Sequence, residues 1–104
     1  MTAISALSTE YLRFPVAATV NGATVNPTGD TVQFAFPAAA SAPVTWFAGS
    51  WETTAAGTYV ARVLVGPTGG VITLTAGSYY DVYIKITDSP ETPVRNLGTL
   101  LATT

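Results

Sequence analysis

The most regular hydrophobic pattern in the chain lies between Gly77 and Asp88. One set of alternate positions is apolar or aromatic: Tyr80, Val82, Ile84 and Ile86. The positions between them are more polar: Tyr79, Asp81, Tyr83 and Lys85. Because successive side chains of a β-strand point to opposite faces, this alternation predicts a strand with one face on a core and the other on solvent or a neighbour. Turn sequences on both sides, with Pro90 behind, set its limits.

A second alternating stretch covers residues 11–20. Its apolar face is formed by Leu12, Phe14, Val16, Ala18 and Val20. Pro15 has no N–H to donate, so we expect an edge strand, or a strand that breaks and switches sheets. If that edge is unpaired, we predict that it pairs with a partner chain. Asn21-Gly22 is the sequence of a two-residue hairpin turn, and residues 23–25 would form its return arm.

Shorter strands fill the remainder of the chain. The pattern predicts them at 31–36, 44–52, 58–65, 71–74 and 96–102. The alanine-rich stretch 37–43 is bracketed by prolines, which favours a loop over a helix. Strands that recur about every 8–12 residues between turns, with no helical period, predict an all-β fold. We therefore expect an antiparallel immunoglobulin-like sandwich of about seven strands.

A tyrosine before the central strand resembles the tyrosine corner of such sandwiches. Leu74, Gly77 and Tyr80 have the matching order, although the usual spacing selects Tyr79 instead. The alternation places Tyr79 on the outer face. Either Tyr80 is therefore the corner residue, or a β-bulge shifts the alternation by one residue and turns Tyr79 inward. The chain has no cysteine, so it lacks the disulfide of antibody-type domains.

The length of 104 residues predicts one domain. A chain of this size buries roughly 60–65% of its unfolded surface and needs no disulfide or metal to fold. Residues 1–8 show no alternation and are expected to form a flexible N-terminal arm, with a single sandwich domain over 9–104. These first residues also lack the basic and apolar regions of a signal peptide.

The composition argues against several classes of partner. The net charge is −2, and the four basic residues are spread along the chain, so neither nucleic acid nor an anionic membrane is an expected partner. Charged residues make up 10% of the chain, where about 25% is usual for soluble domains. A surface so poor in charge suits a protein that is packed against other proteins.

We expect no catalytic, cofactor-binding or metal-binding residues. The chain contains no histidine and no cysteine, which excludes Ser-His-Asp and Cys-His catalysis and zinc sites built on these ligands. Its six acidic residues are not paired around an apolar pocket, as a glycosidase would require. Asp88 and Glu91 could begin a calcium loop, but calcium takes about six to eight oxygen ligands and no further acidic residues follow. A turn in which Asp88 bonds nearby backbone amides ahead of Pro90 is the favoured interpretation.

Aromatic residues are the main candidates for a binding surface. Trp46, Phe47 and Trp51 form one cluster, in which a regular strand would point Trp46 and Phe47 to opposite faces. One tryptophan is expected in the core, and the others could lie in a protein interface or form a platform for sugar. Tyr79 and Tyr83 on the outer face of the central strand extend this surface. Arg13, on the outer side of its strand, completes the interface candidates.

Three stretches resemble a known group of proteins. They are Val25-Asn-Pro-Thr-Gly-Asp-Thr-Val-Gln-Phe-Ala-Phe36, Trp46-x-x-Gly49-x-Trp51-Glu52 and Tyr83-x-Lys85-Ile86-Thr87-Asp88-Ser89-Pro90-Glu91-x-Pro93-Val94. Together they are similar to small immunoglobulin-like virion proteins of actinobacterial tailed phages and prophages. The resemblance covers most of the chain from Tyr11 onward, and its motifs are turn-and-strand patterns rather than catalytic signatures.

The resemblance implies a structural role in a virion assembled in the host cytoplasm. We expect a capsid decoration protein that binds the major capsid protein and forms a homo-oligomer, with a trimer as one form. The alternative is a tail or baseplate module of the same fold. A carbohydrate-binding module for host attachment is a further hypothesis, and an enzyme is the least favoured class.

Overall fold

The computed structural model describes residues 2–16, 18–20, 23–25, 29–43, 45–52, 59–87, 92 and 94–104. Throughout these residues the regular structure is β-strand, as the all-β prediction requires. The strands are β1 (Thr2–Ser5), β2 (Glu10–Val16), β3 (Ala18–Val20), β4 (Ala23–Val25), β5 (Thr31–Ala35), β6 (Phe47–Ala48), β7 (Ser50–Glu52), β8 (Tyr59–Val65), β9 (Tyr79–Thr87) and β10 (Val94–Thr103).

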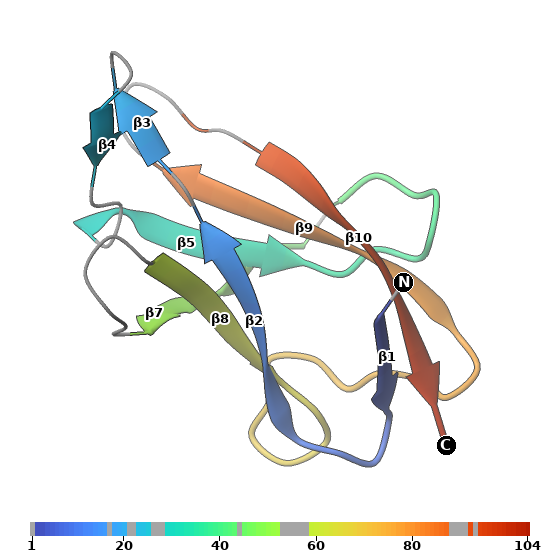
Figure 1. Cartoon of the computed structure of the whole chain (residues 1–104). Coiled ribbons are helices and arrows are strands. Elements are labelled where there is room, and N and C mark those ends of the chain that lie inside the picture. The colour runs from blue at the N-terminus through green and yellow to red at the C-terminus, as the bar shows by residue number, and fades with distance from the viewer. Residues whose placement is uncertain are drawn as a thin grey trace.

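The strands form two layers and a separate hairpin (Figure 1). The larger sheet has the order β1-β10-β9-β5-β6, and the smaller sheet has the order β2-β8-β7. Neighbouring strands are antiparallel except for β1, which is parallel to β10. β3 and β4 pair with each other around residues 21 and 22, as the hairpin signal predicts, although the turn itself lies outside the described residues.

The core lies between the two sheets. Phe34 of β5 is completely buried at its centre, and its ring centroid lies 5.7 Å from that of Phe14 on β2. Alternate residues of β2, β5, β8, β9 and β10 supply most of the remaining apolar side chains. Burial of these side chains is the main favourable contribution to folding.

The alternation predicted for residues 11–20 is confirmed in the part that β2 covers, 11–16. Leu12 and Phe14 of β2 face the core, and Tyr11 and Arg13 lie on the opposite face. The strand that carries Pro15 is an edge strand, because β2 pairs with β8 alone among the described strands. The last predicted strand, 96–102, is present within the longer β10.

The expectation of a flexible arm over residues 1–8 is wrong, because β1 lies within them. Residues Thr2–Ser5 pair with residues 100–103 of β10, and Ile4 is buried in the core. The backbone hydrogen bonds and this one large apolar side chain hold the segment in the sheet. No alternation was visible in the sequence because a four-residue strand with a single large apolar residue is too short to show one.

The predicted strand at 71–74 is also wrong, because the structure has a loop there. The Val71 N–H donates to the carbonyl oxygen of Leu64 at 2.8 Å, and the Gly66 N–H donates to that of Ile72 at 2.9 Å. These two bonds close the turn after β8 rather than extend a sheet. Leu74 is nevertheless buried, which explains the apolar character of the segment.

The predicted strand at 44–52 is divided between the two sheets at Gly49. β6 lies in the larger sheet beside β5, and β7 lies in the smaller sheet beside β8. The Gly49 N–H donates to the carbonyl oxygen of Val32 at 2.9 Å. A Cβ at this position would lie 2.5 Å from Phe34 Cε2 and 2.9 Å from the Arg62 carbonyl oxygen. Only glycine lets the chain cross between the sheets this close to Phe34.

We predict that Gly49→Ala lowers the free energy of unfolding by about 1–3 kcal/mol, the usual cost of overpacking a core. Urea denaturation followed by tryptophan fluorescence measures the change. Gly29→Ala is the matched control, because a Cβ at Gly29 has no atom within 4 Å. Equal stability of the two variants would contradict the assigned role of Gly49.

Candidate interaction surface

The outer face of the larger sheet gathers three of the predicted interface residues. Tyr79 and Tyr83 project from β9 on the side opposite the core, and Tyr79 is 50% exposed. Trp46, just before β6, reaches the same face, where the Lys85 Nζ lies 4.4 Å from the centroid of its ring. We call Trp46, Tyr79, Tyr83 and the neighbouring Val94 and Leu101 of β10 the aromatic face.

The register of β9 and β10 places the two aliphatic members of the aromatic face. Leu101 is the cross-strand partner of Tyr79, and Val94 is the partner of Lys85. Directly opposed residues of an antiparallel pair share a face of the sheet, so Val94 and Leu101 lie among the aromatic side chains. Val94 is 40% exposed. The surface is therefore mixed aromatic and aliphatic, with Lys85 as a cation at its margin.

Asp81, between the two tyrosines, has a structural role. It is only 9% exposed, its Oδ2 accepts from the Ala40 N–H at 3.0 Å, and its Oδ1 accepts from the Thr99 hydroxyl at 3.3 Å. These bonds tie the loop after β5 and the strand β10 to β9. Ala40 has a φ of 67°, a conformation that costs a non-glycine residue energy, and the bond to Asp81 helps to hold it.

Of the two tyrosines between which the sequence left the choice open, Tyr80 makes the hydrogen bond to the chain upstream of β9. Its hydroxyl oxygen accepts from the Thr75 N–H at 2.9 Å, five residues upstream. Its ring packs against the core, whereas Tyr79 faces outward. The hydrogen bond fixes the approach of the loop 66–78 to β9.

Phe47 and Trp51 lie on the core side and not on the aromatic face. The Phe47 ring centroid is 6.3 Å from that of Phe36, so Phe47 and Trp46 point to opposite sides, as predicted. Trp51 packs against the core from β7, and its Nε1–H donates to the carbonyl oxygen of Asp30 at 3.0 Å. Trp51 is thus the one tryptophan that the sequence predicts in the core.

Arg13 lies on the outer face of the smaller sheet, separate from the aromatic face. Its Nε donates to Glu52 Oε2 at 2.7 Å across the intervening strand β8. Two guanidinium groups lie over the Tyr11 ring, that of Arg62 at 4.4 Å and that of Arg13 at 5.7 Å from the ring centroid. The six interface candidates therefore divide among three regions of the molecule.

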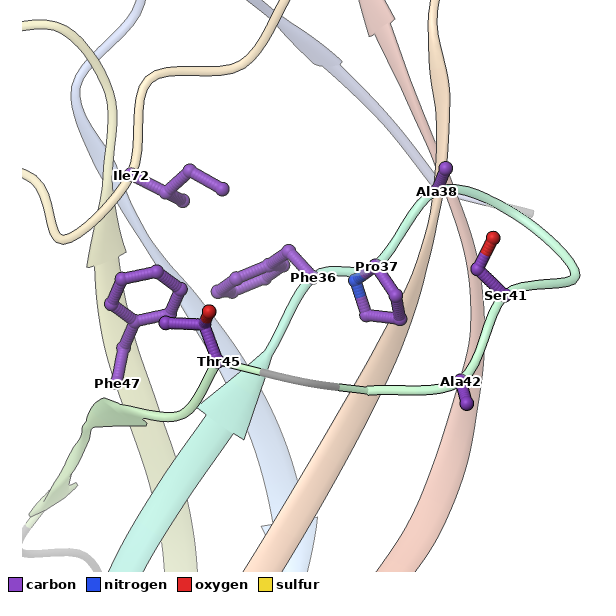
Figure 2. A pocket seen from close by; sticks show the side chains of 8 residues that line it. All are labelled: Phe36, Pro37, Ala38, Ser41, Ala42, Thr45, Phe47 and Ile72. Carbon is purple, nitrogen blue, oxygen red and sulfur yellow. The ribbon is translucent and has the colours of Figure 1, made fainter.

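A pocket of about 370 Å³ opens at one end of the sandwich, and no motif in the sequence indicated it. Figure 2 shows Phe36, Phe47 and Ile72 on one side of it and the loop after Pro37 on the other. Its lining is apolar except for the hydroxyls of Ser41 and Thr45, with no charged side chain. Segments far apart in the sequence build this pocket, so local patterns could not reveal it.

The described residues contain no group of three or more His, Cys, Asp or Glu side chains placed to hold a metal ion. The candidate calcium loop at Asp88 and Glu91 lies outside the described part of the chain. Among the residues that the structure covers, there is no helix of the length and hydrophobicity needed to cross a membrane.

Comparison with known proteins identifies no relative. No protein-family model matches the chain, and neither a curated protein nor a solved structure matches it significantly.

We predict that Tyr80→Phe lowers the free energy of unfolding by about 0.5–1.5 kcal/mol, because the hydrogen bond from the Thr75 N–H is lost. Tyr79→Phe removes a hydroxyl from an exposed position of the same strand and should leave stability within about 0.5 kcal/mol of the parent. Chemical denaturation of both variants tests the assignment. A larger loss for Tyr79→Phe would contradict it.

Ala40→Gly is expected to raise the free energy of unfolding by up to about 1 kcal/mol, because glycine adopts positive φ without strain. The greater freedom of glycine in the unfolded chain offsets part of this gain. Thermal unfolding measures the difference. Ala39→Gly is the control, since Ala39 is not among the residues with positive φ and its change should only destabilise.

Proposed function

We propose that this chain is an immunoglobulin-like module that binds other virion proteins, most specifically as a decoration protein on a phage capsid. The proposal has two parts, the fold family and the role. Four groups of observations support it: the order of the strands, the packing of the core, the aromatic face, and the resemblance of three sequence stretches to phage virion proteins.

The strand order supports the fold family. In immunoglobulin domains of the variable type, one sheet contains the neighbours G, F, C and C′, and the other contains B, E and D. Here β10, β9, β5 and β6 have the first order, and β2, β8 and β7 have the second. Each strand also occupies the matching position along the chain, with β3 and β4 as an added hairpin between B and C.

The core supports the same assignment. The corner tyrosine of immunoglobulin domains lies near the start of strand F, two residues before the second cysteine. Tyr80 occupies the first of these positions in β9, and Val82 the second. Val82, Leu12 and Phe14 surround one small hollow between β2 and β9–β10. Apolar packing of these side chains takes the place of the inter-sheet disulfide.

The single observation that carries the role is the aromatic face. Tyrosine and tryptophan are enriched in the parts of protein interfaces that contribute most to affinity. On this face Trp46 and Tyr79 lie with aliphatic residues on a sheet rather than in a core. A rigid sheet presents such side chains at little entropic cost, which suits repeated binding to a regular assembly.

The alternatives differ in what the aromatic face contacts. A tail or baseplate module would use it against tail proteins, and a host-attachment module would stack its rings on sugar. We favour the capsid protein as the partner because the resemblance implies a virion component present in many copies. The proposal includes self-association on the capsid, with a trimer as one form.

Cryo-EM of phage particles with and without this protein tests the proposal. We expect density on the capsid surface that disappears from particles lacking the protein. Loss of density from the tail would assign the protein to the tail module instead. Unchanged density in both places would contradict any virion role.

Add-back of purified protein to the deleted particles tests the surface. The truncations Tyr79→Ala and Tyr83→Ala should each weaken binding about thirty-fold if they remove hot spots worth about 2 kcal/mol. Leu64→Ala, on the outer face of the smaller sheet, is the matched truncation and should bind as the parent does. Equal weakening by Leu64→Ala would show that the aromatic face is not the contact surface. Inhibition of the parent by host wall polysaccharide would favour the attachment module.

A further inference from the structure

We propose that the free edge of β2 is a strand-addition site for an extended, acidic peptide segment of another protein. This inference concerns a different surface from the aromatic face and does not depend on the virion role. It rests on the hydrogen-bonding edge of β2, the apolar side chains beside it and the charges on its outer face.

The edge itself is the first observation. β2 is seven residues long and, among the described strands, pairs with β8 only. Figure 1 shows β2 at the border of the smaller sheet, with β8 along one side. The backbone groups that face away from β8 can bind a further strand, which is how many domains capture extended peptides. Pro15 lies near the end of β2, so the run from Glu10 to Phe14 keeps its N–H donors.

The usual protection of an edge strand is weak here. Natural edges are often blocked by charged residues that point inward or by lysines along the edge. Three of the four residues on the inward side of β2 are apolar, namely Leu12, Phe14 and Val16, and the fourth, Glu10, is exposed at the start of the strand. Arg13 reaches across β8 to Glu52, away from the free edge. Neither feature prevents a strand from pairing with residues 10–14.

Apolar side chains beside the edge indicate which side chains the added strand would carry on its inner side. Leu12 and Phe14 share a small hollow with Leu97 of β10. Leu97 is 37% exposed because the register of β10 shifts between Asn96 and Gly98. A strand added beside β2 would place alternate side chains over this seam, and apolar ones would remove Leu97 from water. The bound segment is therefore expected to have apolar residues at every second position.

The outer face supplies the charge preference. The guanidinium groups of Arg13 and Arg62 lie beside the Tyr11 ring. Arg13 also pairs with the carboxylate of Glu52, so the three charged side chains form one network. Arg62 donates to the Ser50 hydroxyl at 3.2 Å and, within the described residues, has no carboxylate within 4.0 Å. The network thus carries one excess positive charge. Arg62 lies over the ring of Tyr11 on β2, so an acidic residue on the outer side of an added strand, beside Tyr11, would complement this charge.

The test uses a labelled heptapeptide with blocked ends, Val-Thr-Val-Glu-Val-Thr-Val, and the same peptide with Lys in place of Glu. We expect the Glu peptide to bind by fluorescence anisotropy, with at least ten-fold weaker binding of the Lys peptide at low salt. Hydrogen exchange should slow at those backbone amides of residues 10–14 that face away from β8 when the Glu peptide is bound. Failure of the Glu peptide to bind, or equal binding of both peptides, would overturn the proposal.

Protein variants separate this edge from other surfaces. Leu97→Lys should weaken binding of the Glu peptide at least ten-fold, and Arg62→Glu should reverse the preference between the two peptides. Tyr79→Lys, on the aromatic face, is the matched control and should bind the Glu peptide like the parent. Loss of binding in Tyr79→Lys with retention in Leu97→Lys would place the peptide elsewhere and overturn the assignment. Self-association that Leu97→Lys abolishes, seen by analytical ultracentrifugation, would assign the edge to a second copy and overturn it too.

Discussion

The close contact between the two sheets at Phe34 is the constraint on which the rest of the structure depends. Phe34 is fully buried between Phe14 and the backbone at Gly49. The chain must cross from the larger to the smaller sheet at this point, and it can do so only without a side chain at Gly49. The crossing places Trp51 on the core and Phe47 beside Phe36. The distribution of aromatic side chains thus follows from one glycine and one phenylalanine.

Polar contacts then fix the loops at one end of the sandwich. The Asp81 carboxylate and the Tyr80 hydroxyl, neighbours on β9, accept backbone N–H donors from two different loops. These loops also supply lining residues of the 370 Å³ pocket. Consecutive residues of a strand face opposite sides, so β9 holds one loop through each face. Buried polar side chains with all their partners present are a common way to specify loop positions.

The sequence predicted the parts of the fold in which local patterns and tertiary packing agree. The alternations around Leu12 and Val82 identified β2 and β9 and their buried faces. The sequence could not predict β1, because the pairing of Ile4 with a strand at the far end of the chain leaves no local trace. It also misplaced the segment at Leu74, since a buried loop residue and a strand residue are equally apolar. Among the site residues, Tyr79 was assigned to the outer face correctly, and Trp46 and Phe47 were correctly placed on opposite faces. Which of these two faces outward, and that Trp51 is the tryptophan in the core, needed the crossing at Gly49 to be known.

The parallel pairing of β1 with β10 has a mechanical consequence. The chain enters at the start of β1 and leaves at the end of β10, and the two strands run side by side in the same direction (Figure 1). Tension applied at these two points slides one strand along the other and loads the hydrogen bonds of Thr2–Ser5 together. In a two-stranded hairpin pulled at its open end, the bonds would break one after another instead. Forced unfolding depends on the rate of this first rupture rather than on equilibrium stability. Tension along the chain would therefore load the short first strand in shear rather than peel it away from β10.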